Sequence, residues 1–271
     1  MKKILIMAAV LLFAVSCNKS PRILVLYYSQ TGTTKAVAEQ FQSLLGADIE
    51  AIVPVVPYDG DFRATIERSR KELDEGSFPE IQPLASDISS YDVIFLGYPI
   101  WFGTYAPPVS TVLNSVDFSG KKIVPFCTFG SGGLDSSVKD LQGKLPDVEI
   151  LPGYGVRAAR IAAAPAETER FLKENGFLEG EYEKPEPFPA LRPVTEEESA
   201  IFDAAVGDYP MMHAKAEEVA SRAVSNGMEY LFTAKDAPMP MENVPEMEPR
   251  IIKVYVLVED GQAPVFTQVV R

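Results

Sequence analysis

Apolar residues follow two periods along the first two thirds of the chain. Short continuous apolar runs, typical of buried parallel strands, alternate with longer stretches whose apolar residues recur every three or four positions, as on one face of a helix. The continuous runs predict strands at 22–28, 48–53, 93–97, 122–128 and 149–156. The second pattern predicts helices at 33–45, 61–73, 106–115, 134–145 and 166–175, the last of them closed by Gly176.

Regular alternation of strand and helix predicts right-handed crossovers and a doubly wound, five-stranded parallel sheet with helices on both faces. Residues 180–193 carry four prolines and several charges, which predicts an extended linker.

The rest of the chain, residues 194–271, has a different pattern. Thr195 precedes three glutamates and predicts a capped helix start, and 214–225 continue as a second helical pattern. β-rich runs follow at 228–234, 250–258 and 264–270, with a hairpin turn at Asp260-Gly261 between the last two. We expect a small α+β module in which one helix packs on an antiparallel sheet.

Three predicted strands end in loops with distinctive residues. The first loop has the pattern S-x-T-G-x-T and places Ser29, Thr31, Gly32, Thr33 and Thr34 at a helix start. Free backbone N–H groups and the helix dipole attract an anion there, and the hydroxyls of Thr31 and Thr34 are expected to face solvent and bind it. The Gly-Lys-Ser/Thr ending of one known phosphate loop and the three spaced glycines of another are absent. An ordinary serine/threonine helix cap is the alternative.

The second loop combines aromatic residues with proline and glycine: Pro99, Ile100, Trp101, Phe102 and Gly103. An aromatic face suits a flat, apolar ring system. Trp101 is the only tryptophan of the chain and the best candidate for stacking on such a ring. A core or interface tryptophan is the alternative.

The third loop is rich in glycine and can offer backbone N–H groups to a ligand: Thr128, Phe129, Gly130, Ser131, Gly132 and Gly133. Such a turn is common without any ligand, so its interpretation depends on the other two loops. The three loops follow the first, third and fourth predicted strands. Open α/β sheets bind ligands at the carboxyl ends of their strands, so we expect the loops to form one site.

Together these loops resemble the flavodoxin family, and the resemblance covers residues 21–178. The string G-Y-P-I-W-x-G is similar to its short-chain, lipoprotein-associated relatives, many of which carry a second tryptophan where Phe102 stands. The resemblance implies the strand order 2-1-3-4-5 and FMN as cofactor, with its phosphate in the first loop and its isoalloxazine ring against the other two. It also implies an oxidoreductase or electron carrier whose cofactor performs the redox chemistry. No acid–base pair or nucleophile is identifiable, so we assign no catalytic residue.

Residues 1–17 have a basic start, a short apolar run and small residues before Cys17, and resemble the signal and lipobox of bacterial lipoproteins. This resemblance implies cleavage before Cys17, acylation of its thiol and amine by groups such as palmitate, and lipid anchoring to a membrane of the bacterial cell envelope. A plain secretory signal or a single membrane span is the alternative.

Composition narrows the chemistry further. A formal net charge of −13 disfavours nucleic acid and favours a phosphate cradle made of backbone amides. Cys127 is the only cysteine after Cys17, and its apolar neighbourhood predicts a buried structural thiol. His213 is the sole histidine, so we predict no metal site.

The C-terminal module loosely resembles the cystatin-like fold, but it lacks the inhibitory loop of that family, which leaves a protease inhibitor as the weakest hypothesis. The main rival to a flavoprotein is a flavin-free interaction lipoprotein that binds a partner through this module. For the flavoprotein, the acceptor stays open between a quinone, a small nitro or azo compound and a protein. All three loops precede residue 183, so we expect the α/β domain alone to bind FMN.

Overall fold

The computed structural model describes residues 21–271 except 59–60, 183, 208, 210–211 and 238–247. The predicted signal and Cys17 lie outside the described residues. Within the described part, no helix is long and apolar enough to cross a membrane.

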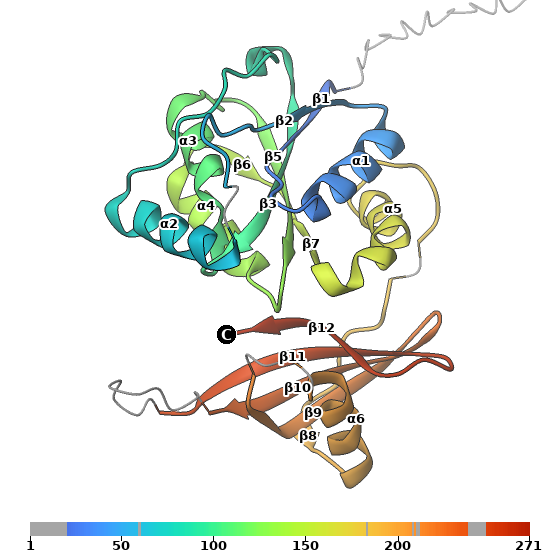
Figure 1. The fold of residues 1–271 in the computed structure, drawn as a ribbon. Helices are drawn as coiled ribbons and strands as arrows, with labels where there is room; N and C mark the ends of the chain where they lie inside the picture. Colours follow the sequence, from blue (N-terminus) through green and yellow to red (C-terminus); the bar gives the residue numbers. More distant parts are fainter. Residues whose placement is uncertain (1–20, 59–60, 183, 208, 210–211, 238–247) are drawn as a thin grey trace, which may run out of the picture.

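The first part of the chain forms a parallel sheet with helices on both faces (Figure 1). Its strands are β1 (Ile23–Tyr27), β2 (Asp48–Ala51), β3 (Val93–Trp101), β5 (Lys122–Phe129), β6 (Glu149–Ile150) and β7 (Tyr154–Arg157), and β4 (Thr104–Tyr105) pairs antiparallel with β3. Its helices are α1 (Thr33–Leu45), α2 (Phe62–Glu75), α3 (Pro107–Ser115), α4 (Leu134–Lys144) and α5 (Ala164–Glu174). The spatial order β2-β1-β3-β5-β6 is the predicted order 2-1-3-4-5, because β4 is only the return arm of a hairpin.

Two apolar cores lie on the two faces of this sheet. Along β1, Leu24 and Leu26 point into the core under α3 and α4, whereas Val25 and Tyr27 point into the core under α1 and α5. Successive side chains of a strand face opposite sides, so a strand buried on both faces reads as a continuous apolar run. This is why the apolar runs identified the strands.

Two strands differ from their predicted bounds. β3 continues four residues beyond the predicted end at 97. Tyr98 and Pro99 still pair in parallel with β5, and the last two residues of β3 pair antiparallel with β4. The predicted strand 149–156 is divided into β6 and β7, both parallel to β5. Pro152 lies in the interruption and has no N–H to donate to a ladder.

The second part of the chain is one helix packed on an antiparallel sheet, as predicted. Helix α6 (Glu196–Val206) covers strands in the order β12-β11-β10-β9-β8. These strands are β8 (Arg192–Pro193), β9 (Ala214–Val224), β10 (Gly227–Asp236), β11 (Arg250–Glu259) and β12 (Val265–Val270). The predicted hairpin joins β11 to β12, and Gly261 in its turn has a positive φ of 75°. The described linker residues 180–191 contain no helix or strand.

The prediction of a second helix at 214–225 is wrong, because these residues form strand β9. A β-bulge opposite Thr233 and Ala234 adds a residue to β9, so Ala216 and Val219 both point into the core although they are three positions apart. With Ala220 also buried, the strand shows the i, i+3, i+4 spacing of a helix face. Pairing along the whole length of β10 overrides the helix propensity of this segment.

Glu198 supports a prediction about stability. Its carboxylate accepts hydrogen bonds from Arg192 Nη1 and Nη2 at 2.8 and 2.6 Å and from the Thr195 N–H at 3.0 Å, which completes the capping box of α6. The hydrogen bonds from Arg192, followed by those from Thr195, lower the pKa of Glu198 to about 2. Burial of the Glu198 carboxylate acts in the opposite direction and raises its pKa, but it is outweighed.

A carboxyl group with a lowered folded-state pKa stabilises the protein fully above its unfolded pKa, and this contribution is lost as pH falls toward the folded value. We expect Glu198→Gln to lower the free energy of unfolding by about 1–3 kcal/mol at pH 7, because the neutral amide loses the ion pair with Arg192. The loss stays in this range because Arg192 is half-exposed and water partly screens its charge. Chemical denaturation from pH 7 to pH 2.5 measures this. The difference from wild type should shrink below pH 4.5, and a constant difference would contradict the assignment.

Candidate functional site

The three candidate loops meet at one edge of the parallel sheet. β1, β3 and β5 are neighbours and run parallel, so the loops that follow them leave from the same edge. The chain continues from β1 to β2 on one side and places β3 on the other side of β1. The candidate site therefore lies where the strand order reverses, the usual ligand position of such sheets.

The first loop leaves the start of α1 open. Gly32 is the N-cap with a positive φ of 89°, and no side chain caps the helix. Thr31 and Gly32 are exposed and Ser29 and Thr33 are half-buried. Gly32 N–H donates a hydrogen bond to Ser29 Oγ at 3.2 Å, and the hydroxyls of Thr31 and Thr33 lie 3.3 Å apart in a second hydrogen bond. The first N–H groups of a helix have no partner within it, so an anion can take the place of the missing cap.

Thr34 does not face solvent, and that expectation is wrong. Its side chain is buried, and its hydroxyl forms a 2.8 Å hydrogen bond with the buried hydroxyl of Thr128. The first turn of α1 packs over the sheet, which directs Thr34 inward toward the end of β5. The hydroxyl pair joins the first candidate loop to the third, and only Ser29, Thr31 and Thr33 present hydroxyls in accessible positions.

The second loop is the tip of the β3–β4 hairpin. Phe102 and Gly103 both have positive φ, 51° and 85°, as a two-residue type I′ turn requires. This turn leaves the Phe102 ring 43% exposed, with the Arg70 guanidinium 4.2 Å from its centre. The half-buried Pro99 and Ile100 precede the tip, and Ile100 packs against Gly133 of the third loop. Ser136 Oγ donates a hydrogen bond to the carbonyl of Gly103.

Trp101 is half-buried and held by two tyrosines. Its ring centre lies 5.9 Å from that of Tyr28 at an interplanar angle of 89°, and 5.2 Å from that of Tyr58 at 76°. Edge-to-face contacts of this kind are favourable aromatic geometries. The indole is therefore fixed from the side of β1 and of the loop that follows β2.

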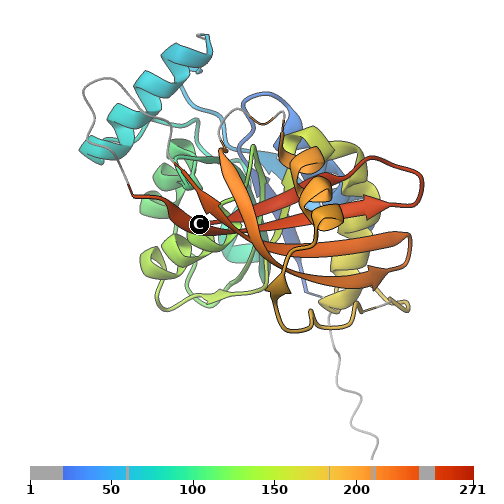
Figure 2. The ribbon, with the colours of Figure 1, turned by 90° about the horizontal axis from the view of Figure 1, so that it is seen from below.

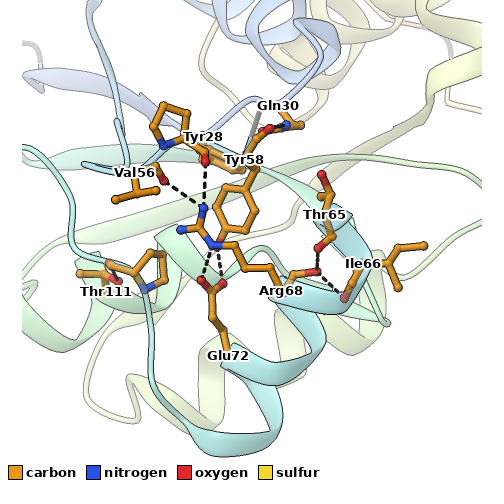
Figure 3. A network of polar contacts seen from close by, with 12 residues as sticks. Tyr28, Gln30, Val56, Tyr58, Thr65, Ile66, Arg68, Glu72 and Thr111 are labelled. Carbon is orange, nitrogen blue, oxygen red and sulfur yellow. Dashed lines mark hydrogen bonds and ion pairs between the residues drawn. The ribbon is translucent and has the colours of Figure 1, made fainter. Parts of the chain in front are cut away.

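The two tyrosines that contact Trp101 belong to a polar network that was not found from the sequence (Figure 3). Gln30 accepts a hydrogen bond from Tyr28 Oη at 2.7 Å and donates one to the carbonyl of Tyr58. Tyr58 Oη donates to Glu72, whose carboxylate also accepts from Arg68 Nε at 2.8 Å. Burial is the main cause that raises the pKa of both tyrosines, which keeps them neutral donors. The i, i+4 spacing of Arg68 and Glu72 is a sequence signal that could have indicated part of this network.

The third loop is held by residues far away in the chain. Phe129 is buried, and the carbonyls of Gly130 and Ser131 accept hydrogen bonds from Arg157 Nε at 2.8 Å and from the Val269 N–H at 2.7 Å. Gly133 is the N-cap of α4 with a positive φ of 118°.

Cys127, just before this loop, is fully buried, and burial raises the pKa of its thiol. It is a structural residue, as predicted.

Comparison with known proteins identifies the family. The family model described as Flavodoxin matches residues 22–164, more than half of the chain. The chain therefore belongs to the flavodoxin family. No curated protein matches it.

Several solved structures are similar to this chain, and three of them are described as flavoproteins from bacteria. A protein assigned as a flavoprotein from Bacteroides uniformis is 28% identical with a TM-score of 0.50, and covers 56% of this chain and 99% of its own. One from Bacteroides eggerthii is 30% identical with a TM-score of 0.49, and covers 58% and 98%. A flavoprotein in complex with FMN from Lactobacillus acidophilus is 24% identical with a TM-score of 0.46, and covers 54% and 99%.

Proposed function

We propose that this protein binds FMN at the carboxyl edge of its parallel sheet and acts as an oxidoreductase or electron carrier. The observation that carries the proposal is the uncapped N-terminus of α1. No side chain caps this helix, and Thr31 and Gly32 lie exposed beside it at the reversal of strand order. Flavodoxin family membership makes a flavin phosphate the anion of choice for this position.

The residues at the site fit the chemistry of FMN. Backbone amides of α1 and the hydroxyls of Ser29, Thr31 and Thr33 would hold the phosphate, which suits a protein with a net charge of −13. Trp101 and Phe102 would flank the isoalloxazine ring. The amides of residues 130–133 would meet its pyrimidine end, where negative charge develops on reduction. FMN would supply the redox chemistry, while these residues bind it, orient it and limit its contact with water.

Titration of the purified protein with FMN tests this proposal. We expect one FMN per chain, seen as quenching of FMN fluorescence and as a yellow protein after gel filtration. A folded protein that leaves FMN fluorescence unchanged would rule the proposal out. The alternative of a flavin-free lipoprotein that binds a partner would then gain support.

We further infer that the protein is anchored to a membrane of the bacterial cell envelope through acylated Cys17, where a quinone or another small acceptor would be within reach. Each buried CH₂ of an acyl chain contributes about 0.8 kcal/mol, so several chains give a stable anchor. Cys17→Ser is expected to leave the signal uncleaved or to release soluble protein. Metabolic labelling with palmitate, followed by membrane fractionation, measures this. Unchanged labelling in the variant would contradict the anchor.

A further inference from the structure

The C-terminal sheet docks on the third candidate loop through the free edge of β12. Figure 1 shows this sheet across the end of the parallel sheet from which the loops leave, and Figure 2 shows it from below, in front of the α/β domain. Val269 pairs with Val254 of β11, but its N–H points out of the sheet and donates to the Ser131 carbonyl at 2.7 Å. An edge strand has unpaired backbone groups, and here one of them binds the loop.

Gly132 makes the second contact with β12. A Cβ built on Gly132 would lie 2.0 Å from the Val269 carbonyl oxygen, closer than any real side chain can approach. The φ of Gly132 is not in the left-handed region, so the docked strand, rather than the local turn, requires glycine here. Two successive loop residues therefore fit against the backbone of the same strand residue.

Arg157 joins the two parts of the chain from the end of β7. Its Nε donates to the Gly130 carbonyl at 2.8 Å, and its Nη1 donates to the Phe266 carbonyl of β12 at 2.9 Å. Its guanidinium lies 3.3 Å from the centre of the Phe266 ring and 5.6 Å from that of Tyr209. Burial lowers the pKa of Arg157 to about 10, so the group stays charged at neutral pH. The half-buried Arg157 guanidinium, with its carbonyl and aromatic partners, therefore makes a specific contact between the third loop and β12, which we call the Arg157 joint.

The opposite side of the same loop contacts the aromatic hairpin. Gly133 packs against Ile100, and Ser136 at the start of α4 bonds to the Gly103 carbonyl. The loop thus lies between the hairpin that carries Trp101 and the edge of β12. Its conformation depends on both neighbours, and one of them belongs to the other part of the chain.

We propose that the C-terminal sheet is a structural part of the flavin site, in which β12 positions residues 130–133 to receive the isoalloxazine ring. This inference rests on the proposed binding of FMN. It modifies the expectation that the α/β domain alone binds FMN, because that domain without β12 would then bind FMN more weakly than the full-length protein. Val269 and Arg157 are positioning residues in this arrangement, because they act on FMN through the loop.

Coupling between docking and FMN binding separates this role from a merely structural contact. If docking raises the affinity for FMN by some factor, FMN must favour docking by the same factor. Docking is measured in the flavin-free full-length protein as hydrogen exchange of the peptides that contain residues 130–133 and β12. FMN affinity is measured in parallel by fluorescence titration.

Gly132→Ala and Val269→Pro test the contact between the third loop and β12 from its two sides. Proline removes the N–H that binds Ser131, and an edge strand tolerates it where that N–H points away from the sheet. We expect both variants to speed exchange of these peptides without FMN and to weaken FMN binding about tenfold. In wild type, FMN should slow the exchange of β12.

Gly143→Ala is the matched control, because this helix position has nothing within 4 Å of a new Cβ and should change neither measurement. Circular dichroism and thermal unfolding check that each variant is folded. Faster exchange in Val269→Pro with unchanged FMN affinity would overturn the inference, as would exchange of β12 that does not respond to FMN. Failure of wild type to bind FMN would instead refute the proposed function, while the docking measurements on flavin-free protein would still stand.

Discussion

Riboflavin is expected to bind this protein at least about a hundredfold more weakly than FMN, since hydrogen bonds to a charged group contribute about 1.5–3 kcal/mol each. Riboflavin lacks the phosphate that the open start of α1 would hold, but it keeps the whole ring system. Titration of the protein with each flavin, monitored by the quenching of flavin fluorescence, gives the two dissociation constants and their ratio. Equal affinities would mean that the phosphate makes no favourable contact with the protein, and the first loop would then not be part of the site.

Two threonines of the first loop should respond differently to substitution. We expect Thr31→Ala to weaken FMN binding about tenfold or more and to leave stability unchanged, because its hydroxyl is exposed. Thr34→Val should instead lower the free energy of unfolding by about 1–3 kcal/mol, because it leaves the buried Thr128 hydroxyl without its partner. Its direct effect on phosphate binding should be small. The reverse outcome would mean that Thr34 turns outward to reach the phosphate.

The sequence predicted the parts of the fold that depend on local pattern. Helix α1 has the bounds that its apolar spacing predicted, and β1 follows from a run buried on both faces. Strand β9 could not be identified this way, because its bulge depends on pairing with β10 and imitates helical spacing. A periodicity argument reads one segment at a time, and here the partner strand decides.

The same limit applies to the candidate site. The loop positions could be predicted, because parallel strands present their carboxyl ends at one edge of a sheet. The direction of the Thr34 side chain could not, since it depends on how α1 packs over β5. The joint between Arg157 and Phe266 connects residues 109 positions apart, and no local pattern in either segment points to the other.

Trp101 offers a direct test of the ring position. It is the only tryptophan, and Tyr28 and Tyr58 hold its indole by edge contacts. A flavin stacked on or beside the indole should quench most of its fluorescence by energy and electron transfer. Trp101→Ala should weaken FMN binding about tenfold, because an aromatic contact adds about 0.5–1.5 kcal/mol to the burial of its area. Strong binding with no quenching would place the ring away from the hairpin.

Phe102 provides the matched variant, because it occupies the next position of the same hairpin and is more exposed. Phe102→Asn removes the second ring but suits the turn, since asparagine before glycine is favoured in type I′ hairpins. We therefore expect this variant to keep the hairpin and the quenching of Trp101. Its loss of FMN affinity then measures the share of Phe102 alone. If Phe102→Asn lowers the FMN affinity more than Trp101→Ala does, the exposed Phe102 ring makes the main contact with the flavin. Trp101 would then serve to hold the hairpin against Tyr28 and Tyr58.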